Sequence, residues 1–244
     1  MSFHAADRVR AVIFDMDGLL LDSERIAYAI GRESSLHLGL PWDHEVAMRM
    51  IGTNSRDGYQ LLQDAFGPDF PVEAHQAEFG RRYEQAIMEG RFPLKPGVHE
   101  LLDLLAQRGL PCAVATSTRR SRALPKLQHV GILERLHGVV GGDEVTHGKP
   151  APDIYLAAAA LVDVPIEDCL VLEDSNTGVR GGLASGAQVV MVPDLLTPAE
   201  DIVARGVTVL ADLHAVAARL QPWNAPKPNF ARGQDQRRGP PEPH

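Results

Sequence analysis

The sequence predicts an α/β fold: a Rossmann-like doubly wound parallel sheet core with an inserted α-helical cap domain. Short apolar runs rich in Val and Ile recur along the chain, each followed by a turn and a helical pattern. Such runs suit the strands of a parallel sheet that is covered on both faces. One long interval carries helical periodicity and no convincing strand. With 244 residues, the chain is long enough for a core and a small inserted domain.

Apolar runs at six positions are the predicted strands. They cover residues 11–14, 113–115, 138–140, 169–172, 189–192 and 207–210. The runs do not alternate strictly between apolar and polar residues, which indicates burial on both faces. Helical stretches between them include residues 98–107, closed by Gly109, and residues 154–161. Strand and helix therefore alternate as they do in a doubly wound fold.

The interval between the first strand and Pro96 is predicted to be helical. Ser23, Asp43 and Ser55 can cap helices that run to about residues 38, 50 and 66. Pro71 can open another helix that runs to about residue 89. We expect residues 1–22 and 93–221 to form the catalytic core and residues 23–92 the cap. The Pro-rich residues 222–244 contain few apolar side chains, and we expect them to be disordered.

Composition argues against several classes of protein. The formal net charge of −8 argues against a nucleic-acid partner, because phosphate contacts need a basic surface. The apolar run at 154–162 is too short to span a membrane, and the first ten residues are too polar for a signal peptide. Cys112 and Cys169 lie in apolar runs and are expected to be buried thiols. We expect a cytoplasmic monomer without a membrane partner.

Polar side chains follow several predicted strands directly. They are Asp15 and Asp17 after the first strand, Thr116 and Ser117 after the second, and Glu173 and Asp174 after the fourth. Strand ends of a parallel sheet meet at one edge, so these groups are expected to lie together with Lys149 from a nearby turn. Helix capping or solvation is the alternative for each motif taken alone. Converging carboxylates need a cation, and oxygen ligands without His or Cys suit Mg2+.

The motifs together resemble those of the haloacid dehalogenase superfamily. They are Phe14-Asp15-Met16-Asp17-Gly18, Thr116-Ser117, Gly148-Lys149-Pro150-Ala151-Pro152-Asp153 and Glu173-Asp174-Ser175, in the order of that superfamily's four motifs. The resemblance covers about residues 10–195. The helical insert resembles the cap of the branch that holds sugar-phosphate phosphatases and β-phosphoglucomutases. The resemblance implies a cap that closes over the crevice of a Rossmann-like core.

The resemblance also implies a role for each motif residue. Asp15 would be the nucleophile that forms an aspartyl-phosphate, and Asp17 the general acid and then the general base. Thr116, with the Ser117 amide, would bind the phosphoryl group, and Lys149 would steady Asp15 and the transferring charge.

The same resemblance implies a Mg2+ ion held by four residues. Its ligands would be Asp15, the Asp17 carbonyl, Asp174 and Glu173. The predicted activity is Mg2+-dependent hydrolysis of a small-molecule phosphate ester, such as a sugar or polyol phosphate.

Three other enzyme activities and one non-catalytic function are the alternatives to this activity. Dehalogenases do not keep an aspartate where this chain has Asp17, and phosphonatases use a cap lysine, whereas residues 23–92 contain no Lys. A β-phosphoglucomutase-like phosphomutase remains the alternative, but it typically carries a His where this chain has Ala27. A non-catalytic binding protein with this fold is a remote alternative, because the motif residues are intact.

Substrate choice is expected to depend on polar residues of the cap near Gly52. The candidates are Glu24, Arg49, Asn54, Ser55 and Arg56. The alternative for each is an ordinary solvated position at a helix end.

Overall fold

A parallel sheet forms the centre of the computed structural model, which describes the backbone of residues 9–51 and 55–220 and the side chains of residues 9–51 and 58–220. Its strands are β1 (Ala11–Phe14), β2 (Cys112–Ala115), β3 (Gly138–Val140), β4 (Cys169–Glu173), β5 (Gln188–Met191) and β6 (Thr208–Val209). They lie in the order β3-β2-β1-β4-β5-β6, and every neighbouring pair is parallel. This is a doubly wound order, in which the winding reverses between β1 and β4. The predicted fold class is confirmed.

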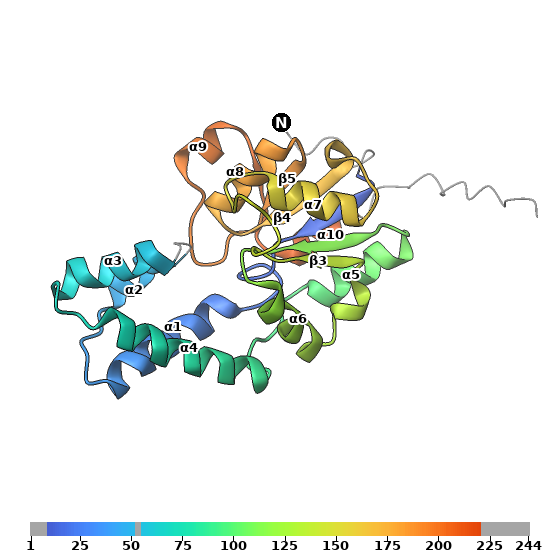
Figure 1. Cartoon of the computed structure of the whole chain (residues 1–244). Coiled ribbons are helices and arrows are strands. Elements are labelled where there is room, and N and C mark those ends of the chain that lie inside the picture. Colours follow the sequence, from blue (N-terminus) through green and yellow to red (C-terminus); the bar gives the residue numbers. More distant parts are fainter. Residues whose placement is uncertain (1–8, 52–54, 221–244) are drawn as a thin grey trace, which may run out of the picture.

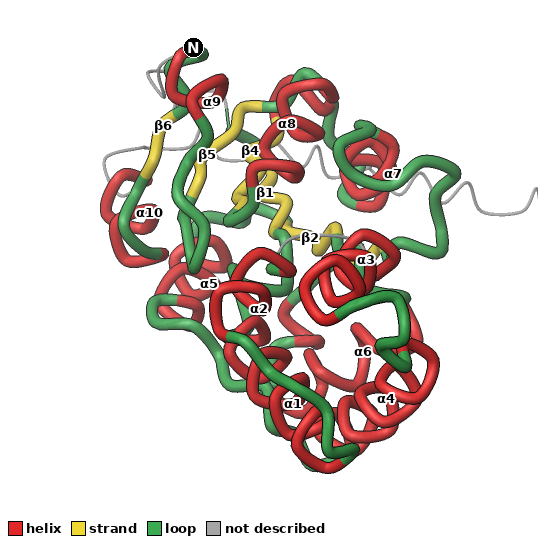
Figure 2. Tube along the Cα trace, turned by 90° about the vertical axis from the view of Figure 1, so that its left-hand side faces the viewer, coloured by secondary structure: helices red, strands yellow, loops and turns green. Residues whose placement is uncertain are grey.

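Helices cover both faces of this sheet (Figure 2). One face packs against α5 (Val98–Gln107), α6 (Arg120–His129) and α10 (Leu213–Leu220), and the other against α7 (Asp153–Leu161), α8 (Asn176–Ser185) and α9 (Glu200–Ala204). Short 3-10 helices, η2 (Leu133–Arg135) and η3 (Ile166–Asp168), join the layers. In β1, Val12 and Phe14 face the first group of helices, and Ala11 and Ile13 face the second. A strand buried on both faces needs consecutive apolar residues, which explains the unbroken runs in the sequence.

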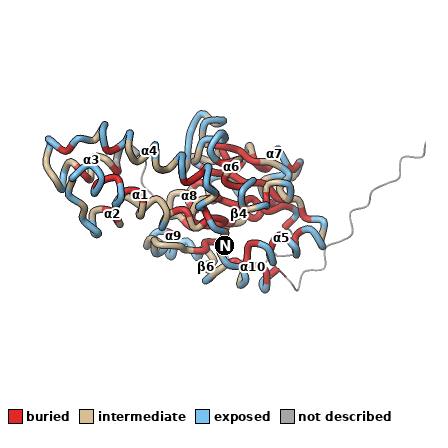
Figure 3. The backbone as a smooth tube through the Cα atoms, turned by 90° about the horizontal axis from the view of Figure 1, so that it is seen from below, coloured by how far each residue is buried: buried red, intermediate tan, exposed pale blue. Residues whose placement is uncertain are grey.

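A helical insert follows β1 and extends away from the sheet (Figures 1 and 3). It contains α1 (Ser23–His37), α2 (His44–Met50), α3 (Ser55–Phe66) and α4 (Val72–Met88). Helix α1 packs along α4, and α4 also contacts α6 of the core. Asp43 caps α2 as predicted, because its carboxylate accepts a hydrogen bond from the Val46 amide at 2.9 Å. The domain boundaries at residues 22/23 and 92/93 remain a proposal.

The two chain segments that join the insert to the sheet run side by side. The Asp22 amide donates to the Pro93 carbonyl at 2.9 Å, and the Lys95 amide donates to the Leu20 carbonyl at 2.9 Å. Leu21 and Leu94 form an antiparallel bridge between them. The insert is therefore attached through a short two-stranded connection, whose first strand follows β1 directly in the sequence.

Some local predictions were wrong. Ser23 is the first residue of α1 rather than its cap, since Asp22 occupies the N-cap position. Strand β4 extends one residue further than predicted because Glu173 pairs with Met191 of β5.

The predicted disordered tail, residues 222–244, lies outside the described residues, as does Asn54.

The predicted burial of the cysteines is confirmed. Cys112 and Cys169 are both free thiols and both buried. Burial raises the pKa of each thiol to about 11, so neither is a ready nucleophile. Within residues 9–51 and 55–220, the structure contains no helix with the length and apolarity needed to cross a membrane.

Candidate active site

The sheet brings the predicted motifs to one edge. Strand β1 pairs with β2 on one side and with β4 on the other. Asp15 follows β1 and its amide donates to the Leu172 carbonyl at 3.0 Å, while Thr116 follows β2 and Asp174 follows β4. This edge is the point where the winding of the sheet reverses, and open α/β sheets bind their ligands at such points.

Lys149 joins two buried carboxylates at this edge. Its ammonium lies 2.5 Å from Asp15 Oδ1 and 2.5 Å from Glu173 Oε1, and it donates to the Ala115 carbonyl at 3.0 Å. The Lys149 side chain is only 6% exposed. Burial alone would lower the pKa of Lys149, but the charges of Asp15 and Glu173 outweigh it and raise the pKa well above its ordinary value. The ammonium is therefore held in its charged form.

Glu173 has a protein donor at each carboxylate oxygen. The Tyr155 hydroxyl lies 2.7 Å from Oε1, and the amide and hydroxyl of Ser175 donate to Oε2 at 3.2 and 3.1 Å. Gly178 makes room for this carboxylate, because a Cβ there would lie 2.0 Å from the Glu173 Cδ. The sequence did not identify Tyr155, whose hydroxyl is the one polar group in an otherwise apolar stretch of α7.

Asp15, Glu173 and Asp174 form an acidic cluster that fits a hard divalent cation. One carboxylate oxygen from each lies within 4.8 Å of the others. Burial, opposed by Lys149 and reinforced by Glu173, raises the pKa of Asp15 to about 8. Burial and the charges of Asp15 and Glu173 raise the pKa of Asp174 well above its ordinary value. The protein's own groups leave this negative charge incompletely balanced, and oxygen donors alone suit Mg2+ better than zinc.

Gly18 allows the first motif to approach the fourth. It has a φ of +90°, and a Cβ at this position would lie 2.1 Å from Asp174 Oδ2. A side chain here would be strained and would displace the Asp174 carboxylate. The glycine that follows Asp17 in the sequence is thus required by the shape of the acidic cluster.

Asp17 turns away from the acidic cluster towards the second motif. Its Oδ2 accepts hydrogen bonds from Thr118 Oγ1 at 2.6 Å and from Thr116 Oγ1 at 3.4 Å. Its Oδ1 accepts one from Lys126 Nζ at 2.8 Å. Burial alone would raise the pKa of Asp17, but the Lys126 charge and these hydrogen bonds outweigh burial and lower it. Beside it, Ser117 is exposed at the end of β2.

Lys126 is the main residue of this region that sequence reasoning missed. It lies on α6, and its side chain is 0% exposed. A lone lysine in a helix usually faces solvent, so the sequence did not indicate a role for Lys126 in the site. The available signal was helical spacing, since Lys126 follows the buried Ala123 by three residues and precedes the buried Leu127.

The residues predicted to select the substrate are only partly described. Glu24 lies near Asp17 and Asp194, and burial followed by these two charges raises its pKa to about 7. Arg49 is exposed on α2. Asn54 and the side chains of Ser55 and Arg56 lie outside the described residues.

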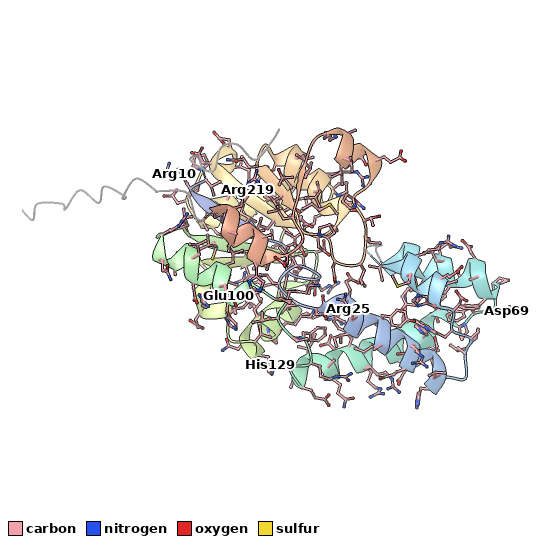
Figure 4. All side chains as sticks on the ribbon, turned by 180° about the vertical axis from the view of Figure 1, so that it is seen from behind. Arg10, Arg25, Asp69, Glu100, His129 and Arg219 are labelled. Atoms are coloured by element: carbon pink, nitrogen blue, oxygen red, sulfur yellow. The ribbon has the colours of Figure 1, made fainter. Side chains whose placement is uncertain are left out.

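Asp194 connects the loop after β5 to both ends of the insert. Its Oδ1 accepts hydrogen bonds from Lys95 at 2.6 Å and from Arg25 at 3.0 Å, and its side chain is 2% exposed. Arg25 lies at the start of α1, where the insert meets the core (Figure 4). These ion pairs fix the first turn of α1 beside the segment that returns to the sheet.

Comparisons with known proteins agree with this geometry. Residues 12–192 match the family model described as haloacid dehalogenase-like hydrolase. A phosphorylated carbohydrates phosphatase of Thermotoga maritima is 31% identical over 74% of this chain and 83% of its own length. (DL)-glycerol-3-phosphatase 2 of Arabidopsis thaliana is 32% identical over 87% of this chain and 92% of its own length.

A solved structure has the same fold. It is a Thermotoga maritima protein provisionally described as a β-phosphoglucomutase, and it superposes with a TM-score of 0.75. The two sequences are 27% identical, and the match covers 88% of this chain and 99% of the other.

We predict that Glu24→Gln stabilises the protein at pH 8 but not near pH 5. A carboxyl whose pKa is raised from 4.5 to about 7 holds its proton more tightly when folded, so its contribution to stability is lost as the pH rises through 7. We expect a gain on the order of 1–3 kcal/mol in the free energy of unfolding at pH 8, discounted for partial exposure. Urea unfolding titrations of the wild type and the variant at pH 5 and pH 8, in EDTA, measure this gain.

The matched control for this prediction is Glu100→Gln, which removes the same charge from an exposed position on α5 (Figure 4). An equal gain at both pH values, or an equal gain in the control, would contradict the burial of Glu24 as the cause.

Proposed function

We propose that this chain, which belongs to the haloacid dehalogenase-like hydrolases and is a phosphoric monoester hydrolase, is a Mg2+-dependent phosphatase of small sugar or polyol phosphates. The observation that carries this proposal is the Asp15 carboxylate, which lies 2.5 Å from the buried Lys149 ammonium and beside Asp174. The names of the two relatives support a phosphorylated carbohydrate or glycerol phosphate as the substrate class.

The proposed reaction has two displacements at phosphorus. An oxygen of Asp15 attacks the phosphoryl group, the bond to the ester oxygen breaks, and Asp17 protonates the departing oxygen. Asp17 then accepts a proton from water as the water oxygen attacks the aspartyl-phosphate. The bond from phosphorus to Asp15 breaks, and inorganic phosphate leaves. The separate hydrogen-bond partners of Asp15 and Asp17 support these separate roles.

Positively charged and donor groups would stabilise the transferring phosphoryl group. Lys149 holds Asp15 in line and offsets charge on the phosphoryl oxygens. Thr116 and the Ser117 amide, at the end of β2, would bind those oxygens. Lys149 also donates to the Ala115 carbonyl at 3.0 Å, so it lies beside the end of β2 that carries Thr116 and Ser117.

Asp15, the Asp17 carbonyl and Asp174 are the residues that we propose hold Mg2+. The ion, when bound, would offset the charges of the phosphoryl oxygens and of Asp15. Both oxygens of Glu173 already accept hydrogen bonds from Lys149, Tyr155 and Ser175, so its carboxylate would act chiefly by fixing Lys149. We propose Glu173 chiefly as the residue that fixes Lys149, and keep it as a fourth candidate ligand because one of its oxygens lies within 4.8 Å of ligand atoms of Asp15 and Asp174.

Hydrolysis is proposed over phosphomutase activity. Ala27, on α1, occupies the position where the resemblance led us to expect a mutase His, and a methyl group cannot transfer a proton. A mutase would interconvert β-glucose 1-phosphate and glucose 6-phosphate without net release of phosphate. That interconversion, measured in the presence of Mg2+, separates the two activities.

We expect Asp15→Asn to reduce turnover by at least about 1,000-fold, because an amide cannot form the covalent intermediate. Phosphate release from a panel of sugar and polyol phosphates, with Mg2+ or with EDTA, measures it. Asp69→Asn is the control, since it removes the same charge from an exposed loop at the far end of the insert (Figure 4). Mg2+-dependent turnover retained by Asp15→Asn would remove Asp15 as the nucleophile.

We also expect Mg2+ to raise the melting temperature of the wild-type protein and not of Asp174→Asn. A ligand at 100 times its Kd stabilises the folded state by about 2.7 kcal/mol, which corresponds to a shift of roughly 5–10 °C for a chain of this size. Thermal melts with and without EDTA measure the shift. The same shift in Asp174→Asn would show that Mg2+ binds elsewhere.

A further inference from the structure

Lys126 is a fully buried ammonium with partners on three separate segments. Its Nζ donates to Asp17 Oδ1 at 2.8 Å and to the Tyr83 hydroxyl of α4 at 2.6 Å. It also lies 4.5 Å from the centre of the Phe92 ring and 4.9 Å from that of Tyr83. The Lys126 side chain is 0% exposed, so in this structure it cannot reach a substrate directly. Its contact with the proposed catalytic residues is the one with Asp17.

Packing alone does not explain a lysine at this position. Its neighbours on the buried side of α6 are Ala123 and Leu127, both 0% exposed, and a methionine would fill similar space without the cost of burying a charge. A buried ammonium is stable only beside a counter-charge, and Asp17 supplies one. Cation–π contacts with Phe92 and Tyr83 add further stabilisation. The position therefore favours a cation for its contact with Asp17.

The two oxygens of Asp17 are held from opposite elements. Thr118, in the segment after β2, binds Oδ2 at 2.6 Å, and Lys126 on α6 binds Oδ1 at 2.8 Å. These two contacts determine the direction of the carboxylate. The Asp17 side chain is still 23% exposed, so it remains partly accessible to solvent. Removing the ammonium would leave Oδ1 without its charged partner, so that only the threonine hydroxyls at Oδ2 would orient the carboxylate.

The partners of Lys126 also include the helical insert. Tyr83 belongs to α4, and its ring contacts Phe79 and Phe92 at centroid distances of 5.5 and 5.2 Å. Phe92 lies in the segment that returns to the sheet and is 1% exposed. The Lys126 ammonium thus contacts both Asp17, the proposed general acid and base, and the packed aromatic rings of Tyr83 and Phe92.

We propose that Lys126 is a positioning residue for the phosphatase reaction, which fixes the Asp17 carboxylate and links its position to the docking of α4 through Tyr83 and Phe92. The inference rests on the proposed phosphatase function and assigns a further residue to it. Lys126→Met should then impair the proton transfers of Asp17 while leaving the attack of Asp15 intact.

Two substrates with different leaving groups test this proposal. A sugar or glycerol phosphate releases an alkoxide that needs a proton from Asp17, whereas 4-nitrophenyl phosphate releases a stable phenolate that does not. Single-turnover measurements give the rate at which Asp15 is phosphorylated by each. We expect Lys126→Met to slow the alkyl ester about 100-fold, within the usual range of general acid catalysis, and the aryl ester less than about 5-fold. The KM for the alkyl ester should change little.

Arg122→Met is the matched control. Arg122 on α6 forms an ion pair with Glu84 on α4 at 2.5 Å, so this variant removes a positive charge that joins the same two helices. The two side chains are 44% and 51% exposed, and Arg122 donates its hydrogen bond to Glu84. We expect its rates with both substrates to equal those of the wild type.

Two milder variants protect the test against a failure of Lys126→Met to fold. Tyr83→Phe removes one hydroxyl from Lys126 and should give a smaller loss that is again confined to the alkyl ester. Lys126→Arg keeps the charge and should recover part of the lost rate.

The outcomes separate this inference from the proposed function. Equal losses with both substrates, or no loss with either, would overturn the positioning role of Lys126 while leaving a phosphatase. Wild-type protein that releases no phosphate from any ester with Mg2+ would instead overturn the proposed function itself.

Discussion

The Lys149 ammonium lies between Asp15 and Glu173, 2.5 Å from each carboxylate, at the carboxyl end of a buried sheet. Breaking a buried ion pair of this kind costs about 3–5 kcal/mol, because the remaining charge is left without a partner. Neighbouring residues are arranged around it: Tyr155 and Ser175 donate to Glu173, and Gly178 leaves the space that this carboxylate fills. Tyr155 of α7, and Ser175 and Gly178 at the start of α8, therefore accommodate the buried Glu173 carboxylate.

Two lysines give the two aspartates after β1 different chemistry. Lys149 contacts Asp15 from the loop before α7, and Lys126 contacts Asp17 from α6. Burial and nearby carboxylates nevertheless raise the pKa of Asp15 to about 8, whereas Lys126 and the threonine hydroxyls lower the pKa of Asp17. The proposed roles need the opposite protonation states, an ionised Asp15 for attack and a protonated Asp17 for donation to the leaving oxygen. A protonated Asp15 is a poor nucleophile, so a cation beside it would supply the missing ionisation.

Features governed by continuous sequence were predictable, and those governed by distant contacts were not. The strands at Ala11–Phe14 and Gly138–Val140 match their predicted bounds because burial on both faces leaves unbroken apolar runs. Parallel pairing then brings the strand ends to one edge, which made the convergence of Asp15 and Asp174 predictable. Lys126 meets Asp17 across 109 residues of sequence. Its spacing from Ala123 and Leu127 places it on the buried side of α6 but does not identify Asp17 as its partner. Tyr155 was missed for the same reason.

The position of the insert explains how a cap can influence chemistry that it does not itself contain. Its first connection leaves β1 through Gly18 and Leu21, directly after the two aspartates, and its return segment binds back to Leu20 through Lys95. Asp194 forms ion pairs with both Arg25 of α1 and Lys95 of the return segment, so it holds the two connections together. Lys126 and Tyr83 add a second connection from α4 to Asp17. Docking of the insert and orientation of Asp17 are therefore expected to change together, while Asp15, held by Lys149 within the core, stays fixed.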